Sequence, residues 1–135
     1  MHLKPLANSR IFYLEDDFYI AEDTRERLGE QGAEVVLTAS VPRAFDALRD
    51  EGFDAALLDI NISGTSSVPV VRSLRETGVP VLFLTGYARD ILPADLSSCP
   101  LLMKPIEWDP VVRTLQELLG RGEGDDVIST RTHRQ

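Results

Sequence analysis

Five short apolar runs alternate along the chain with segments in which apolar residues recur every three or four positions. The runs, such as IFYL at 11–14 and VLFL at 81–84, are apolar at nearly every position. Such runs predict strands that are buried on both faces, as in a parallel sheet covered by helices. The pattern therefore predicts an α/β fold with strands at 10–15, 33–38, 53–59, 79–85 and 100–103.

Helices are predicted between these strands from their apolar stripes and from residues typical of helix ends. Ser40 is expected to cap the second helix, and Asp109 to cap the last one with Pro110 at its first position. Pro93 interrupts the fourth helical segment, which is therefore the weakest of the five and is expected to be mobile. The helices are predicted at 17–31, 40–50, 66–76, 88–97 and 109–119.

All of these elements fit one domain, which we expect to span residues 10–120. Residues 1–9 form a short irregular lead before it. Residues 121–135 contain few large apolar side chains and are predicted to be a disordered C-terminal tail. A chain of 135 residues is long enough to bury one core, and its sequence contains no internal repeat.

The charge balance argues against some classes of partner. With 14 basic and 22 acidic residues the net charge is −8, so we expect no basic patch that neutralises nucleic-acid phosphates. No apolar run approaches the roughly 18 residues of a membrane-spanning helix, and the first residues lack the apolar segment of a signal peptide. The single cysteine, Cys99, cannot form an internal disulfide. We therefore expect a cytoplasmic protein that binds neither nucleic acid nor membrane directly.

Charged and hydroxyl side chains stand where four of the five predicted strands end. Ligands of open parallel sheets bind outside the carboxyl ends of the strands. If the first, third, fourth and fifth strands are neighbours, these side chains meet in one crevice. They are Glu15, Asp16 and Asp17 after the first strand, Asp59 in the third, Thr85 in the fourth and Lys104 after the fifth.

This combination of side chains suits a cation and a phosphoryl group. Carboxylates that lie this close cannot all stay ionised without a cation. A small, partly hydrated site with only oxygen ligands suits Mg²⁺. Once the metal, Lys104 and a hydroxyl neutralise the charge, Asp59 can attack a phosphoryl group, and the reaction proceeds by positioning and electrostatics.

Each of these residues also has an ordinary structural explanation when it is viewed alone. An acid after a strand is usually a helix cap, which is the favoured interpretation of Asp17. An isolated Asp59 would more often be a turn residue, and Lys104 with Pro105 can form a surface turn. The prediction of a site therefore rests on the coincidence of polar residues at four strand ends.

Four motifs in this order resemble those of the receiver domain of two-component response regulators. They are LEDD at 14–17, LLDIN at 57–61, FLTGY at 83–87 and MKPI at 103–106, and the resemblance covers about residues 10–120. It implies a flavodoxin-like, doubly wound fold with a five-stranded parallel sheet in the order 2-1-3-4-5 and helices on both faces.

The resemblance also implies a role for each residue of the predicted site. Asp59 would be the phosphoacceptor, and a cis peptide bond before Pro105 would aim Lys104 inward. Thr85 would donate a hydrogen bond to the phosphoryl group and Lys104 would pair with it. The implied Mg²⁺ ligands are Asp16 directly, Glu15 largely through water, Asp59 and the backbone carbonyl of Asn61.

The sequence departs from the usual receiver pattern at several positions. Most receivers carry Met-Pro three and four residues after the acceptor, where this chain has Ile62 and Ser63. The usual aromatic switch residue, three before the lysine, is Leu101 here. The FLTGY stretch is similar to the FAT GUY subgroup, named for Phe-Ala-Thr-Gly-hydrophobic-Tyr, but after Gly86 and Tyr87 the final tyrosine is missing. Either Tyr87 takes over the switch role or no aromatic switch operates.

The sequence thus predicts a stand-alone receiver that is not an enzyme in its own right. A sensor histidine kinase or phosphotransfer protein would supply its phosphoryl group. The phosphorylated protein would dock an unknown downstream protein or act as a relay shuttle or phosphate sink, and a homodimer is left open.

Other functions are weighed against this one. A pseudo-receiver would share the fold and bind partners without being phosphorylated, but the intact set of acids, threonine and lysine argues against it. An aspartate-nucleophile phosphatase needs an acid at the position of Asn61, and an amide cannot transfer the proton. A flavin-binding protein would need a phosphate-cradling loop after the first strand, where this chain has acids.

Overall fold

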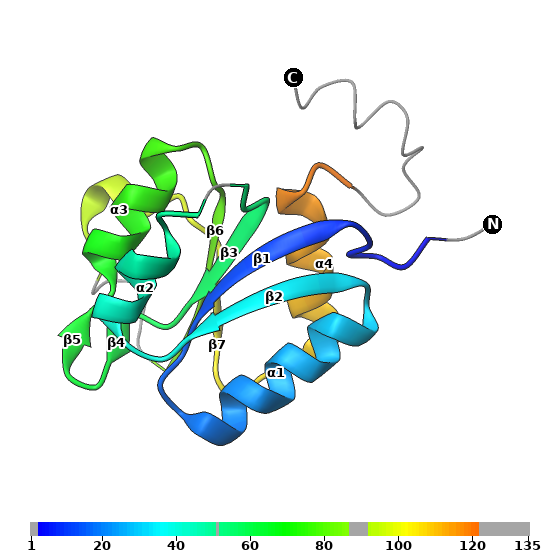
Figure 1. The fold of residues 1–135 in the computed structure, drawn as a ribbon, viewed down its shortest axis with the longest axis horizontal. Coiled ribbons are helices and arrows are strands. Elements are labelled where there is room, and N and C mark those ends of the chain that lie inside the picture. Colours follow the sequence, from blue (N-terminus) through cyan, green and yellow to red (C-terminus); the bar gives the residue numbers. More distant parts are fainter. Residues whose placement is uncertain (1–2, 51, 87–91, 122–135) are drawn as a thin grey trace.

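A five-stranded parallel sheet forms the centre of the molecule in the computed structural model, which describes residues 3–50, 52–86 and 92–121 (Figure 1). The strands run in the order β2-β1-β3-β6-β7, and β6 and β7 are the fourth and fifth of the predicted strands. The predicted order 2-1-3-4-5 is therefore confirmed. The strands are β1 (Ser9–Leu14), β2 (Ala33–Thr38), β3 (Ala55–Leu58), β6 (Val81–Thr85) and β7 (Leu101–Met103).

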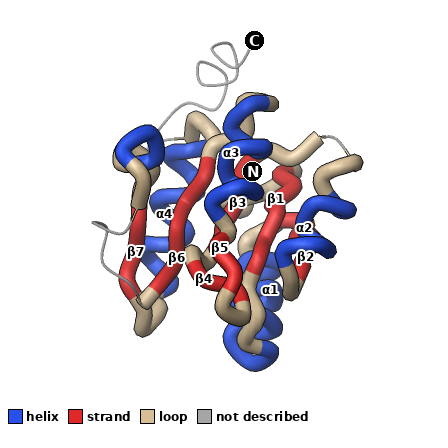
Figure 2. Tube along the Cα trace, turned by 90° about the vertical axis from the view of Figure 1, so that its left-hand side faces the viewer, coloured by secondary structure: helices blue, strands red, loops and turns tan. Residues whose placement is uncertain are grey.

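Within the described residues, four α-helices cover the two faces of this sheet, an arrangement that can be followed in Figures 1 and 2. Alternate residues of β1 point to opposite faces: Phe12 belongs to one apolar cluster and Ile11 to the other. The first cluster packs against α2 and α3, and the second against α1 and α4. Both faces of β1 are buried, which explains why its sequence is apolar without interruption. The helices are α1 (Phe18–Glu30), α2 (Val41–Ala47), α3 (Val68–Glu76) and α4 (Trp108–Leu118).

Two of the predicted helix starts are confirmed by their capping hydrogen bonds. The side chain of Asp17 accepts a hydrogen bond from the backbone N–H of Ile20 (3.0 Å), so this acid caps α1. Ser40 accepts one from the N–H of Arg43 (3.3 Å) and caps α2.

The last helix begins earlier than predicted, so the assignment of Asp109 as its cap is wrong. The capping residue is Glu107, whose backbone is extended (φ −115°, ψ 126°), and Trp108 is the first helical residue. Asp109 lies inside the first turn, where the carboxylate faces the positive end of the helix dipole.

The predicted helix at 88–97 is replaced in its described part by one turn of 3-10 helix, Ala94–Leu96. Pro93 precedes this turn with an extended backbone (φ −58°, ψ 153°) and cannot donate a helical hydrogen bond. Residues 87–91 lie outside the described residues, as does the predicted tail from residue 122 onward.

The segment after β3 was predicted as a loop, yet it contains a small antiparallel hairpin. β4 (Asn61–Ile62) pairs with β5 (Thr65–Ser66), and Asn61 lies opposite Ser66. Because Ser66 belongs to this hairpin, α3 begins at Val68 rather than at the predicted Ser66. In the part of the chain that the structure describes, no helix is both long and apolar enough to cross a bilayer.

The lead before β1 packs closely on the turn between α1 and β2. Leu6 is fully buried and its N–H donates to the carbonyl of Gln31 (2.8 Å). Gly32 follows with φ +101°, and a Cβ built on it would lie 2.8 Å from the Cα of Ala7. Glycine is therefore required here both by its backbone angle and by the close approach of another backbone segment.

We expect Gly32→Ala to lower the free energy of unfolding more than Gly52→Ala does. Gly52 has a similar angle (φ +97°) but open space around it, so its substitution carries only the backbone strain. That strain is on the order of 1–3 kcal/mol, and Gly32→Ala adds a steric clash with Ala7. Urea unfolding of both variants measures the difference, and equal losses would contradict the tight packing of the lead.

Candidate functional site

Polar residues from four strands meet at one edge of the sheet. Glu15 and Asp59 directly follow β1 and β3, Thr85 ends β6, and Lys104 directly follows β7. The backbone ladder continues past the strands and aligns these residues: the N–H of Asp59 donates to Leu14 (3.1 Å), and that of Lys104 to Thr85 (2.8 Å). The structure therefore brings these polar residues together at the carboxyl edge of neighbouring parallel strands.

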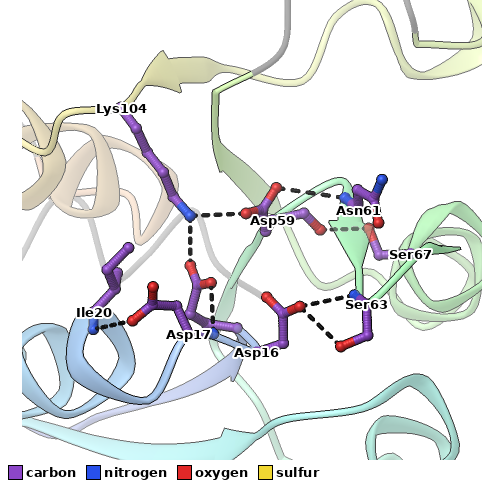
Figure 3. Close-up of polar contacts among 9 residues, drawn as sticks. Asp16, Asp17, Ile20, Asp59, Asn61, Ser63, Ser67 and Lys104 are labelled. Atoms are coloured by element: carbon purple, nitrogen blue, oxygen red, sulfur yellow. Dashed lines mark hydrogen bonds and ion pairs between the residues drawn. The ribbon is translucent and has the colours of Figure 1, made fainter.

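The ammonium of Lys104 forms ion pairs with two carboxylates at this edge of the sheet. Its Nζ lies 2.9 Å from Oε1 of Glu15 and 2.8 Å from Oδ2 of Asp59 (Figure 3). The side chains of the two acids are only 2% and 10% exposed, and that of the lysine is 20% exposed. The lysine is therefore the cation that allows two buried acids to lie side by side in this structure.

The pKa values in this group reflect a balance between burial and pairing. Burial raises the pKa of Glu15 above its usual value, although the hydrogen bond from Lys104 opposes the shift. Burial acts to lower the pKa of Lys104, but the hydrogen bonds to Asp59 and Glu15 outweigh it and the pKa is raised overall. The lysine is therefore held in its charged form.

Asp16 faces a different neighbour. Its Oδ2 accepts hydrogen bonds from the backbone N–H (2.8 Å) and the hydroxyl (3.0 Å) of Ser63 in the β4–β5 hairpin (Figure 3). Burial acts to raise the pKa of Asp16, but these two bonds lower it below its usual value overall. The carboxylate is thus kept ionised at the rim of the crevice.

Two residues of the segment after β3 bond to Asp59, one at its carboxylate and one at its backbone carbonyl. The N–H of Asn61 donates to Oδ1 of Asp59 (3.4 Å), and the buried hydroxyl of Ser67 donates to the Asp59 backbone carbonyl (2.6 Å). The side chain of Asn61 is itself fixed, because its Oδ1 accepts from the N–H of Gly64 (2.8 Å). With Lys104 on Oδ2 and Asn61 on Oδ1, both oxygens of the Asp59 carboxylate are held by hydrogen bonds.

The carboxylate and carbonyl oxygens at this edge of the sheet can be compared with the ligands that Mg²⁺ requires. Within the described ranges, no three His, Cys, Asp or Glu side chains form a ready-made cluster for a metal ion. Mg²⁺ does not need one, because it is usually held by one or two carboxylates and keeps several waters. Asp16 and Asp59, with the backbone carbonyl of Asn61, provide oxygen donors of that kind, and Lys104 bonds both Glu15 and Asp59 beside them. These residues fit the ion.

The other predicted residues are placed as follows. Thr85 is fully buried at the crevice edge, Gly86 is exposed directly after it, and Leu101 is half-buried in β7. Tyr87 lies outside the described residues. Asp17, which the sequence favoured as a cap rather than a site residue, is the cap of α1. The peptide bond between Lys104 and Pro105 is cis, as predicted.

Two serines of the site were not identified from the sequence. Ser63 was noticed only as a departure from the receiver pattern, and Ser67 only as part of a polar loop. Neither stands at the end of a strand of the five-stranded parallel sheet, which was the signal that located the other residues. The small hairpin that carries Ser63 to Asp16 has a loop-like composition and gives no periodic signal.

A model of the response regulator receiver domain matches residues 11–114 of the chain. The chain belongs to the response regulator receiver family. It is 29% identical over 132 residues to the response regulator MprA of Mycobacterium tuberculosis H37Rv, covering 93% of this chain and 56% of MprA. MprA of Mycolicibacterium vanbaalenii is 31% identical over 124 residues, which cover 87% and 53% of the two chains. This chain thus spans about half the length of the curated relatives it matches.

Solved receivers share the fold. SdrG from Sphingomonas melonis Fr1 is 30% identical with a TM-score of 0.68, and the match covers 82% of this chain and 96% of SdrG. TrrA from Thermotoga maritima, solved in complex with Mg²⁺-BeF, is 25% identical with a TM-score of 0.70, over 82% and 98% of the chains. Receivers belong to two-component signalling systems, and phosphorylation and Mg²⁺ binding are standard for the family.

Replacing Lys104 by methionine should destabilise this receiver in Mg²⁺-free buffer by roughly 1–3 kcal/mol, because it leaves two buried carboxylates without their donor. Chemical unfolding measures the change. Arg72→Met is the matched control, since it removes a cation from an ion pair with Asp95 whose side chains are both about half exposed. Equal effects of the two substitutions would contradict a special role for the Lys104 ion pairs.

Proposed function

We propose that this receiver accepts a phosphoryl group on Asp59 from a sensor histidine kinase or a phosphotransfer protein, with Mg²⁺ bound. The observation that supports this most is the position of the Asp59 carboxylate, which is oriented by Lys104 on one oxygen (2.8 Å) and by Asn61 on the other (3.4 Å). A nucleophile held in this way meets the phosphorus atom without losing further conformational freedom.

In the proposed reaction, a carboxylate oxygen of Asp59 forms a bond to phosphorus while the phosphorus–nitrogen bond of the donor's phosphohistidine breaks. The electron pair of the broken bond stays on the histidine nitrogen, so charge and atoms balance. Lys104 pairs with the phosphoryl oxygens, and Thr85 donates its hydroxyl to them. Both lie at the ends of adjacent strands, where their backbones are hydrogen-bonded (2.8 Å). The protein contributes positioning and electrostatic stabilisation.

The metal ligands are assigned in the same proposal. Asp16, Asp59 and the backbone carbonyl of Asn61 would hold Mg²⁺, and Glu15 would act on it through water. When bound, the ion neutralises charge on the phosphoryl oxygens and on the acids.

The finer features of the signalling role are proposed by analogy with the family. Leu101 stands where most receivers have an aromatic switch residue, so signalling proceeds without that residue. Tyr87, two residues after Thr85, would tune the lifetime of the phosphoryl group as the corresponding position does in receivers, and Gly86 beside it is a further switch or tuning position. The phosphorylated receiver would dock a downstream protein, relay the group or act as a sink. The stand-alone arrangement and a homodimer stay predictions, because the curated relatives are about twice as long as the region matched here.

The phosphoacceptor assignment predicts a phosphate adduct on Asp59. Incubation with Mg²⁺ and acetyl phosphate should add the mass of one phosphoryl group to the wild-type protein. Asp59→Asn should abolish the adduct because the amide is a poor nucleophile. The control Asp46→Asn, at an aspartate on α2 whose side chain is 68% exposed, should leave the adduct unchanged. Intact-protein mass spectrometry measures all three.

An equal adduct in wild-type protein and Asp59→Asn would contradict the assignment. Absence of any adduct with small donors and with a panel of phosphorylated histidine kinases would favour the pseudo-receiver alternative. The panel is needed because a small donor lacks the docking contacts that position a protein donor.

A further inference from the structure

Ser63 occupies the tip of the β4–β5 hairpin and contacts Asp16, 47 positions earlier in the chain. Its backbone N–H and its hydroxyl donate to the same acceptor, Oδ2 of Asp16, at 2.8 Å and 3.0 Å. Figure 3 shows this contact on the side of Asp16 that is turned away from Lys104. The two bonds therefore fix one oxygen of the carboxylate and leave Oδ1 without a bond to Ser63.

The hairpin holds Ser63 in place. Ser63 and Gly64 form its two-residue turn between the paired residues Ile62 and Thr65, and both turn residues have positive φ (52° and 82°). This is the pattern of a tight type I′ hairpin turn. Ile62 is 2% exposed and anchors the hairpin in the core, while Asn61 accepts a hydrogen bond from Gly64 across the turn. The donors of Ser63 are therefore presented by a rigid element.

Proline, the residue common among receivers at this position, is incompatible with this arrangement. Its ring holds φ near −65°, whereas Ser63 has φ +52°. Proline also has neither the N–H nor the hydroxyl that reach Asp16. The serine and the hairpin turn thus belong together, and this chain has them at the position where most receivers have proline.

We propose that Ser63 is a positioning residue for the metal site, which fixes Asp16 through Oδ2 so that Oδ1 is directed to Mg²⁺. The proposal rests on the function proposed above, because it takes Asp16 to be a metal ligand. Carboxylates that bind metals are commonly oriented by such outer hydrogen bonds, and loss of one lowers metal affinity. The opposite possibility is a latch, in which Ser63 competes with the ion for Asp16. Two bonds to a single oxygen favour positioning, since they leave the other oxygen for the ion.

Ser63→Gly tests the positioning role, because glycine keeps the N–H and the positive φ but removes the hydroxyl. Isothermal titration of the full chain with MgCl₂ should show a dissociation constant for Mg²⁺ about tenfold higher than that of the wild type. Ser66→Ala is the matched control: it removes another hydroxyl of the same hairpin, one that accepts from the N–H of Val68 (3.1 Å). Its Mg²⁺ affinity should equal that of the wild type.

A metal-free measurement separates this proposal from the proposed function. Without Mg²⁺, the double variant Ser63→Gly/Asp16→Ala should lose less melting temperature than the sum of the losses in the two single variants. Both substitutions disrupt the same contact, so their effects are not additive. Additive effects would overturn the contact itself. Unchanged or tighter Mg²⁺ binding by Ser63→Gly would overturn the positioning role while leaving the metal site intact. Coupled melting effects in the variants, together with no Mg²⁺ binding by the wild-type protein, would overturn both the metal site and the role given to Ser63.

Discussion

The crowding of carboxylates at the carboxyl edge of a buried sheet is the constraint on which the site depends. Glu15 and Asp59 are nearly excluded from water, and two ionised carboxylates in such a place repel one another. Lys104 offsets this repulsion, because its Nζ lies within 3 Å of a carboxylate oxygen of each acid. The proposed Mg²⁺ would add a second cation to a site in which Lys104 already pairs with two acids.

The parallel sheet is what makes this arrangement possible. Because β1, β3, β6 and β7 are neighbours and run in one direction, residues far apart in the chain come to one edge with their backbones already aligned. The rest of the site is supplied by the segment after β3. There the β4–β5 hairpin orients Asp16 through Ser63, and Ser67 fixes the backbone of Asp59. The ends of the parallel strands thus carry the buried charged groups, and the segment after β3 carries the two serines that bond to Asp16 and Asp59.

Much of the fold and of the site could be predicted from the sequence because both depend on strong local signals. The apolar runs defined the five strands, and acids, threonine and lysine at strand ends defined the crevice. Asp109 was misassigned because two acids, Glu107 and Asp109, stand near the start of the last helix. Which of them is the cap depends on the backbone angles and not on residue type alone. The contact between Ser63 and Asp16 could not be predicted, because it depends on two positive φ angles in a hairpin of only two-residue strands.

We propose that Asp16 and Asp59 bind Mg²⁺ beside the acids that Lys104 already pairs, and that the bound ion stabilises the folded protein further. The most direct test is thermal unfolding of the wild-type protein at increasing MgCl₂, with NaCl at matched ionic strength as the control for general screening. A ligand that binds only the folded state raises stability with its concentration. We expect the melting temperature to rise through the millimolar range with MgCl₂ and not with NaCl. A melting temperature indifferent to millimolar Mg²⁺ would contradict it.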